Sequence, residues 1–146
     1  MSRRAIIFDF NWTLYDPKSQ SLFPDVRELL EEVSLSRRLI LYSKLEGGRD
    51  SLIEDLDILK YFESTHFVEH KTAEGILNIL ADHELKAAET IIVGDLMTSE
   101  LAAGHGAGLD TVWLRHSKFA DEVGDFEPTH TVRSIIELRG LLKQIN

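Results

Sequence analysis

Residues 6–14 read Ile-Ile-Phe-Asp-Phe-Asn-Trp-Thr-Leu, an apolar run that ends in a carboxylate and passes into a polar loop. The apolar residues predict a buried strand over residues 5–10. In an open α/β sheet, ligands bind beyond the carboxyl ends of the strands, so we expect Asp9 to face the binding region.

A second apolar run ends in the same way. Residues 91–95 read Ile-Ile-Val-Gly-Asp, so a second strand is expected to end at Asp95. Two parallel strands would carry Asp9 and Asp95 to one edge of the sheet. Magnesium prefers oxygen ligands and is commonly bound through one or two carboxylates, so the pair suggests a Mg²⁺ site.

The rest of the chain alternates strand-like and helix-like patterns, which is typical of βαβ units around a parallel sheet. Further strands are expected at residues 39–42, 66–68 and 111–114, and helices at residues 25–34, 50–59, 99–107 and 135–145. One more helix is expected to follow Thr72 as its N-cap and to carry the apolar residues Ile76, Leu77, Ile79 and Leu80. Residues 11–23 are expected to form a loop or a small hairpin. The pattern predicts a three-layer Rossmann-like α/β sandwich. Its sheet is expected to be mainly parallel and five-stranded, with helices on both faces and a single domain spanning residues 1–146.

Composition restricts the function. The 146 residues carry a net charge of −9, which disfavours a nucleic-acid partner because such partners need clustered Lys and Arg. There are no cysteines, so disulfides, thiolate metal sites and cysteine nucleophiles are excluded. Residues 1–4 lead directly into a strand and no apolar run approaches membrane-spanning length, so we expect a cytoplasmic protein without a signal peptide or a membrane partner.

Four motifs in order resemble those of the haloacid dehalogenase (HAD) superfamily of aspartate-nucleophile phosphatases. The first is Asp-x-Asp-x-Thr in that family, the second a Ser or Thr that ends a strand, the third a Lys before a helix, and the fourth Gly-Asp followed by another acid. This sequence supplies Asp9, Asn11 and Thr13, then Ser43, then Lys71, and finally Gly94, Asp95 and Glu100. The spacings between the first three motifs leave no room for a family cap domain, so the chain resembles a capless member.

The resemblance implies a mechanism. Asp9 would attack phosphorus and form an aspartyl phosphate, which water then hydrolyses. Mg²⁺ would be held by Asp9, Asp95 and the Asn11 backbone carbonyl, with Glu100 as a further ligand, direct or through water. Ser43 would donate to a phosphoryl oxygen and Lys71 would neutralise charge. Lys44 remains an alternative to Lys71, and Glu100 also fits a purely helix-capping role.

Asn11 departs from the family pattern, because an Asp at this position normally protonates the leaving group and then activates water. An amide cannot transfer that proton, so alkyl phosphates should be hydrolysed slowly and aryl or acyl phosphates faster. Trp12 stands where the family usually has Gly, and it would either shape an open site or simply pack. Arg49, after Gly47 and Gly48, lies where it could contact substrate or merely follow a turn.

The first functional hypothesis is therefore a Mg²⁺-dependent phosphatase. Its substrate would be a phosphorylated small molecule or a phosphoryl group on a larger partner, with homo-oligomer contacts left open. Two alternatives remain at this point: a catalytically impaired phosphate-binding or protein-interaction module, and a phosphotransferase that retains its aspartyl phosphate.

Overall fold

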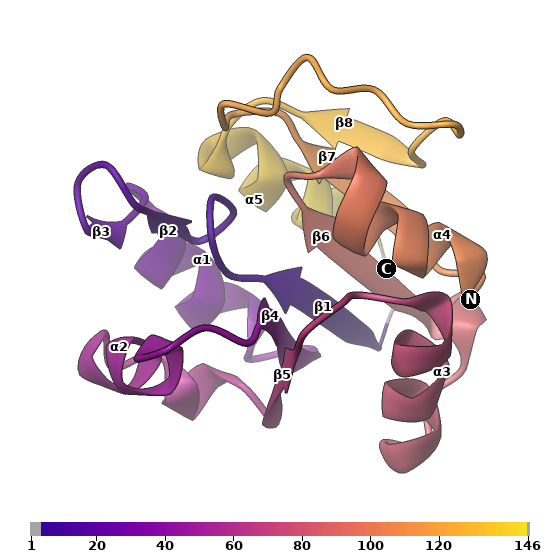
Figure 1. The fold of residues 1–146 in the computed structure, drawn as a ribbon, viewed down its shortest axis with the longest axis horizontal. Coiled ribbons are helices and arrows are strands. Elements are labelled where there is room, and N and C mark those ends of the chain that lie inside the picture. The colour runs from indigo at the N-terminus through magenta and orange to yellow at the C-terminus, as the bar shows by residue number, and fades with distance from the viewer. Residues whose placement is uncertain (1–3, 146) are drawn as a thin grey trace.

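The fold is organised around a six-stranded parallel sheet (Figure 1). The computed structural model describes residues 4–145. Its strands lie in the order β5-β4-β1-β6-β7-β8, with every neighbouring pair parallel. Their bounds are β1 Ala5–Asp9, β4 Arg38–Lys44, β5 Ser64–Val68, β6 Thr90–Gly94, β7 Asp110–Leu114 and β8 His130–Val132. Residues 1–3, on which the expected lack of a signal peptide partly rests, lie outside the described residues.

The predicted count of five strands is wrong, because β8 forms a sixth strand. It is only three residues long and pairs with β7 from Val112↔His130 to Leu114↔Val132. Of its residues only Val132 is buried, so the segment lacks the apolar run by which the other strands are found. The parallel three-layer α/β architecture itself is confirmed.

Helices cover both faces of the sheet (Figure 1). Alternate residues of β1 point to opposite sides, since Ile6 and Phe8 belong to one buried cluster and Ala5 and Ile7 to the other. The first cluster includes residues of α1 (Val26–Val33), α2 (Arg49–Asp55) and α5 (Ile135–Gln144), and the second includes residues of α3 (Ala73–Asp82) and α4 (Ala102–Gly106). None of the described helices is both long and apolar enough to cross a membrane.

Short elements account for most of the differences from the predicted boundaries. Residues 11–23 contain the expected hairpin, β2 (Tyr15–Asp16) and β3 (Ser21–Leu22). The helix expected over residues 50–59 ends at Asp55 and is followed by the 3₁₀ turn η1 (Leu59–Tyr61), and a second 3₁₀ turn, η2 (Ala87–Glu89), precedes β6. The helix expected over residues 99–107 begins as a π-helical turn, η3 (Met97–Leu101), before α4.

The order of the strands places the binding edge. The chain moves from β1 to β4 on one side and later returns to β6 on the other, so β1 and β6 flank the point where strand order reverses. Phe8 is in register with Val93. Asp9 and Asp95 therefore emerge next to each other at the switch point, where open α/β sheets bind ligands.

Candidate active site

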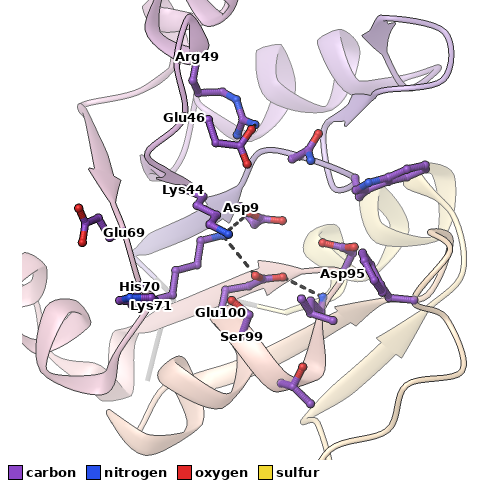
Figure 2. Close-up of a pocket in the computed structure, with 15 residues that line it drawn as sticks. Asp9, Lys44, Glu46, Arg49, Glu69, His70, Lys71, Asp95, Ser99 and Glu100 are labelled. Carbon is purple, nitrogen blue, oxygen red and sulfur yellow. Dashed lines mark hydrogen bonds and ion pairs between the residues drawn. The ribbon is translucent and has the colours of Figure 1, made fainter.

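Three buried carboxylates meet at the end of β1 and β6. Asp9, Asp95 and Glu100 are 4%, 3% and 2% exposed, and one oxygen of each lies within 4.8 Å of the others. Figure 2 shows the three side chains directed toward a common space. The strand pattern predicts Asp9 and Asp95 at one edge, the family resemblance adds Glu100, and the structure brings all three together.

Lys71 is the cation of this cluster. Its side chain is 7% exposed, and its Nζ donates to Asp9 Oδ1 and, at 3.3 Å, to Glu100 Oε1 (Figure 2). Thr13 Oγ1 lies 2.8 Å from Asp9 Oδ2 and 3.3 Å from Asp95 Oδ1. Lys44, the alternative lysine, lines the same cavity but is exposed. The structure thus places Lys71 rather than Lys44 against the predicted nucleophile.

The electrostatics of the cluster favour an additional cation. Burial, followed by the charges of Asp9 and Glu100, raises the pKa of Asp95 to about 9. Burial and the Asp9 carboxylate likewise raise the pKa of Glu100. The pKa of Lys71 is raised, since the Asp9 and Glu100 carboxylates outweigh the effect of its burial. A single ammonium therefore does not allow all three buried carboxyls to ionise at neutral pH, whereas a further cation would.

One oxygen of the cluster has no protein partner. Asp95 Oδ2 is buried and accepts no hydrogen bond from any residue in the range 4–145. Buried polar atoms are nearly always satisfied, so an orphaned carboxylate oxygen beside two other carboxylates fits a ligand for a cation. The donor set consists of hard oxygen ligands, which suits Mg²⁺.

Gly94 and the π-helical turn η3 explain how Glu100 reaches this point. A Cβ at position 94 would lie 2.7 Å from Glu100 Cδ, so only glycine leaves room for the Glu100 side chain over the end of β6. The Leu96 backbone N–H donates to Glu100 Oε2 at 2.8 Å and fixes the carboxylate. Single π turns occur frequently at functional sites, and this one carries a site carboxylate.

The site opens into a cavity of about 330 Å³ lined by both polar and aromatic side chains. Among the predicted residues, Asp9, Asn11, Lys71, Asp95 and Glu100 line it. Ser43 does not. It is fully buried, and its Oγ accepts a hydrogen bond of 2.9 Å from Arg49 Nη1.

Arg49, the first residue of α2, instead lines the cavity near the end of β4. It is only 7% exposed, and its Nη2 lies 2.8 Å from Glu46 Oε2 (Figure 2). The guanidinium also lies 5.2 Å from the Phe10 ring centroid. Gly48, with φ +78°, provides the left-handed turn that starts α2 and allows this approach. The sequence left open whether Arg49 contacts substrate or only follows the Gly47-Gly48 turn. Its burial at this edge makes it a candidate for substrate binding.

The segment after β7 supplies a wall of the cavity that the sequence did not reveal. His116 Nε2 lies 2.7 Å from the Trp12 carbonyl oxygen, and because that oxygen can only accept, Nε2 carries the hydrogen. Lys118 Nζ lies 5.5 Å from the Trp12 ring centroid and 5.1 Å from that of Phe119. No charged or glycine motif marks residues 116–119, so only their proximity to the sheet edge could have suggested them.

Trp12 itself adopts an unusual backbone conformation. Its φ is +64°, in the left-handed region where glycine is the ordinary occupant, and a bulky residue there costs about 1–2 kcal/mol. Strain of this kind persists where the surroundings fix it, and here the Trp12 N–H donates to Tyr15 O at 2.8 Å while its carbonyl accepts from His116. The left-handed conformation accounts for the glycine of the resembling family.

Comparisons with known proteins agree with this geometry. Residues 71–138 match the family model described as HAD-hydrolase-like. Over 109 residues, 63% of the chain, it is 27% identical to the glyceraldehyde 3-phosphate phosphatase of Pyrococcus furiosus, and over 59 residues, 40% of the chain, it is 34% identical to the HAD-hydrolase YfnB of Bacillus subtilis. These matches cover 45% and 25% of the two relatives, so the chain spans less than half of their lengths.

Solved structures share the whole fold. The magnesium-bound structure of Bacillus subtilis YfnB superposes with a TM-score of 0.84 at 13% identity, covering 97% of this chain and 99% of that one. The core domain of a phosphoglycolate phosphatase from Streptococcus pneumoniae gives a TM-score of 0.73 at 18% identity, covering 98% and 97%. These likenesses show that the chain has the fold of haloacid dehalogenase-like hydrolases, and residues 71–138 carry the match to the HAD-hydrolase-like family model.

Proposed function

We propose that this chain is a Mg²⁺-dependent phosphohydrolase of the capless type that uses Asp9 as its nucleophile. The observation that carries the proposal is the position of Asp9: a buried carboxylate at the floor of a cavity, held by Lys71 on one oxygen and Thr13 on the other. Phosphatase relatives among the matched proteins support the reaction class.

Asp9, Asp95 and Glu100 would hold the metal, together with the Asn11 backbone carbonyl. When bound, Mg²⁺ supplies positive charge against the phosphoryl oxygens and the carboxylates. The raised pKa of Asp95 and its orphaned Oδ2 support this assignment. Lys71 would orient Asp9 and compensate its charge, since its ammonium contacts both Asp9 and Glu100.

In the first step, an Asp9 oxygen would attack phosphorus, and the bond from phosphorus to the leaving oxygen would break with its electron pair on that oxygen. Water would then attack phosphorus, returning the Asp9 carboxylate and releasing phosphate. Ser43 would act through Arg49: its hydroxyl accepts from the guanidinium, which in turn faces the cavity and can bind a phosphoryl oxygen. Thr13 would orient Asp9.

Asn11 lines the cavity where the family places its acid. Since the amide cannot protonate a leaving oxygen, we propose that hydrolysis is confined to leaving groups that depart as stable anions. The same substitution favours the second candidate, a phosphate-binding module with little turnover.

The test uses acetyl phosphate, whose acetate leaving group needs no acid. Wild type should hydrolyse it with Mg²⁺ and not with EDTA, and Asp9→Asn should abolish turnover. Labelled phosphate should be trapped on wild type by rapid acid quench and not on Asp9→Asn. A stable labelled enzyme with slow turnover would indicate a phosphotransferase. Absence of both turnover and label, with phosphate binding retained, would leave the binding module.

A further inference from the structure

The cavity has an aromatic wall beside the nucleophile that the proposed chemistry does not use. Trp12 and Phe119 both line the cavity that contains Asp9 and Asn11. Lys118 Nζ lies 5.5 Å from one ring centroid and 5.1 Å from the other, so the two rings flank one space with an ammonium in it. We propose that this wall is a subsite for a flat aromatic leaving group, which makes aryl phosphomonoesters the substrate class; the inference rests on the phosphohydrolase function proposed above.

Hydrogen bonds fix the backbone of both residues that form the wall, Trp12 and Phe119. On the Trp12 side, the backbone N–H donates to Tyr15 O and the carbonyl accepts from His116 Nε2, which fixes the Trp12 backbone at φ +64°. On the other side, the Phe119 backbone N–H donates to Ser117 Oγ at 3.0 Å. Trp and Phe rings with restricted freedom bind planar groups with little loss of entropy.

The chemistry of Asn11 points to the same substrate independently of the wall. Without a general acid, the leaving oxygen must depart as an anion. A phenol ionises near pH 10, so a phenolate leaves far more easily than an alkoxide. The bond between phosphorus and the aryl oxygen would break toward the oxygen, and the phenolate would take its proton from water. A wall that prefers aromatic groups and a site that prefers phenolates select the same esters.

Lys118 decides between an aromatic and a cationic leaving group, because paired aromatic rings also bind ammonium ions. Its ammonium already lies over both rings and would repel a second cation. The same charge attracts a developing phenolate. Lys118 is exposed and its side chain is unbranched, so it can move aside for a ring without disturbing the fold.

The first experiment measures binding, because binding does not depend on turnover. Calorimetry with Mg²⁺ present should give a dissociation constant at least about tenfold lower for phenylphosphonate than for methylphosphonate, an amount that aromatic contacts ordinarily supply. The preference should disappear in Trp12→Gly, whose glycine suits φ +64°, and in Phe119→Ala. Val123→Ala, in the same loop but with a side chain that is 71% exposed, should retain it. Equal constants for the two phosphonates in wild type would overturn the proposal.

The second experiment compares kcat/KM for phenyl phosphate, phosphocholine and acetyl phosphate. The ratio of phenyl to acetyl phosphate should fall about tenfold in Trp12→Gly, chiefly through KM. An unchanged ratio, or a wild type that prefers phosphocholine, would refute the aromatic subsite while leaving the acetyl phosphate result to judge the phosphohydrolase itself. Free phosphotyrosine and a phosphotyrosine peptide separate the two sources of an aryl phosphate: a higher kcat/KM for the peptide indicates a protein substrate, and equal values indicate a small molecule.

Discussion

Lys71→Met tests whether the lysine is the charge that permits three carboxylates to be buried together. Methionine retains a long unbranched chain but removes the ammonium that contacts Asp9 and Glu100. Breaking a buried ion pair by deleting one partner typically costs about 3–5 kcal/mol, because the remaining charge is left uncompensated. We expect the free energy of unfolding to fall by roughly that amount at pH 7 in EDTA.

The magnitude has an upper bound that depends on pH. The folded variant can remove the uncompensated negative charge by binding a proton at one carboxyl. For a group with an ordinary pKa near 4, protonation costs about 1.4 kcal/mol for each unit by which the pH exceeds 4. The bound is therefore about 4 kcal/mol at pH 7 and about 1.4 kcal/mol at pH 5. With a typical stability of about 5–15 kcal/mol, the variant should still fold.

Urea denaturation followed by circular dichroism, at pH 5 and pH 7 and with and without Mg²⁺, measures these quantities. Saturating Mg²⁺ should restore part of the loss, about 2.7 kcal/mol at 100 times the dissociation constant. Lys44→Met is the matched control, because this exposed lysine lines the same cavity, and it should change stability by less than about 0.5 kcal/mol. A loss below about 1 kcal/mol at pH 7, or an equal loss at both pH values, would refute the reasoning.

Three other variants test separate parts of the structure. Gly94→Ala should displace Glu100 and weaken Mg²⁺ binding about 10-fold to 100-fold in a calorimetric titration; unchanged affinity would contradict the role given to the missing Cβ. Asn11→Asp should raise kcat on alkyl phosphates by up to about 10²-fold to 10⁴-fold and on aryl phosphates by less, so equal gains on both would argue against a missing acid. Hydrogen bonds from Arg38 lower the pKa of Glu63 to about 2, so this pair stabilises the fold above pH 4.5 and the contribution is lost as pH falls toward 2. Between pH 5 and pH 3, the melting temperature of Glu63→Gln should therefore fall by less than that of wild type. An equal fall in both proteins would show that Glu63 does not contribute to the pH dependence of stability.

The sequence predicted the parts of the fold that have a strong local signal. The buried strands β1 and β6 appear as apolar runs ending in Asp9 and Asp95, and Thr72 caps α3 through the Gly75 N–H as its position before an apolar stripe indicates. β8 was not predicted, because an edge strand of three residues needs no apolar run. Its place depends on hydrogen bonds to β7, which no local pattern encodes.

The candidate site likewise has a part that the sequence predicted and a part that it did not. Asp9 and Asp95 follow β1 and β6, so strand order alone brings them to one edge. The family resemblance predicts Lys71 and Glu100 there, and Glu100 reaches the edge because Gly94 leaves room for its side chain. The left-handed Trp12, the burial of Ser43 under Arg49 and the wall formed by Phe119 depend on how loops fold over that edge. Loop conformation follows from tertiary contacts such as the one between His116 and the Trp12 carbonyl, which lie 104 residues apart in sequence.

The central position of β1 also determines how much of the chain must be synthesised before both edges of this strand are paired. One edge of β1 pairs with β4, only about 30 residues later, but the other edge waits for residues 90–94 of β6. Until those residues leave the ribosome, the strand that contains Ile6, Ile7 and Phe8 has one unpaired edge, which is a template for wrong pairing. Since Asp9 also meets Asp95 and Glu100 only then, the metal site should form no earlier than this stage of folding, and a translation pause before residue 90 should increase aggregation.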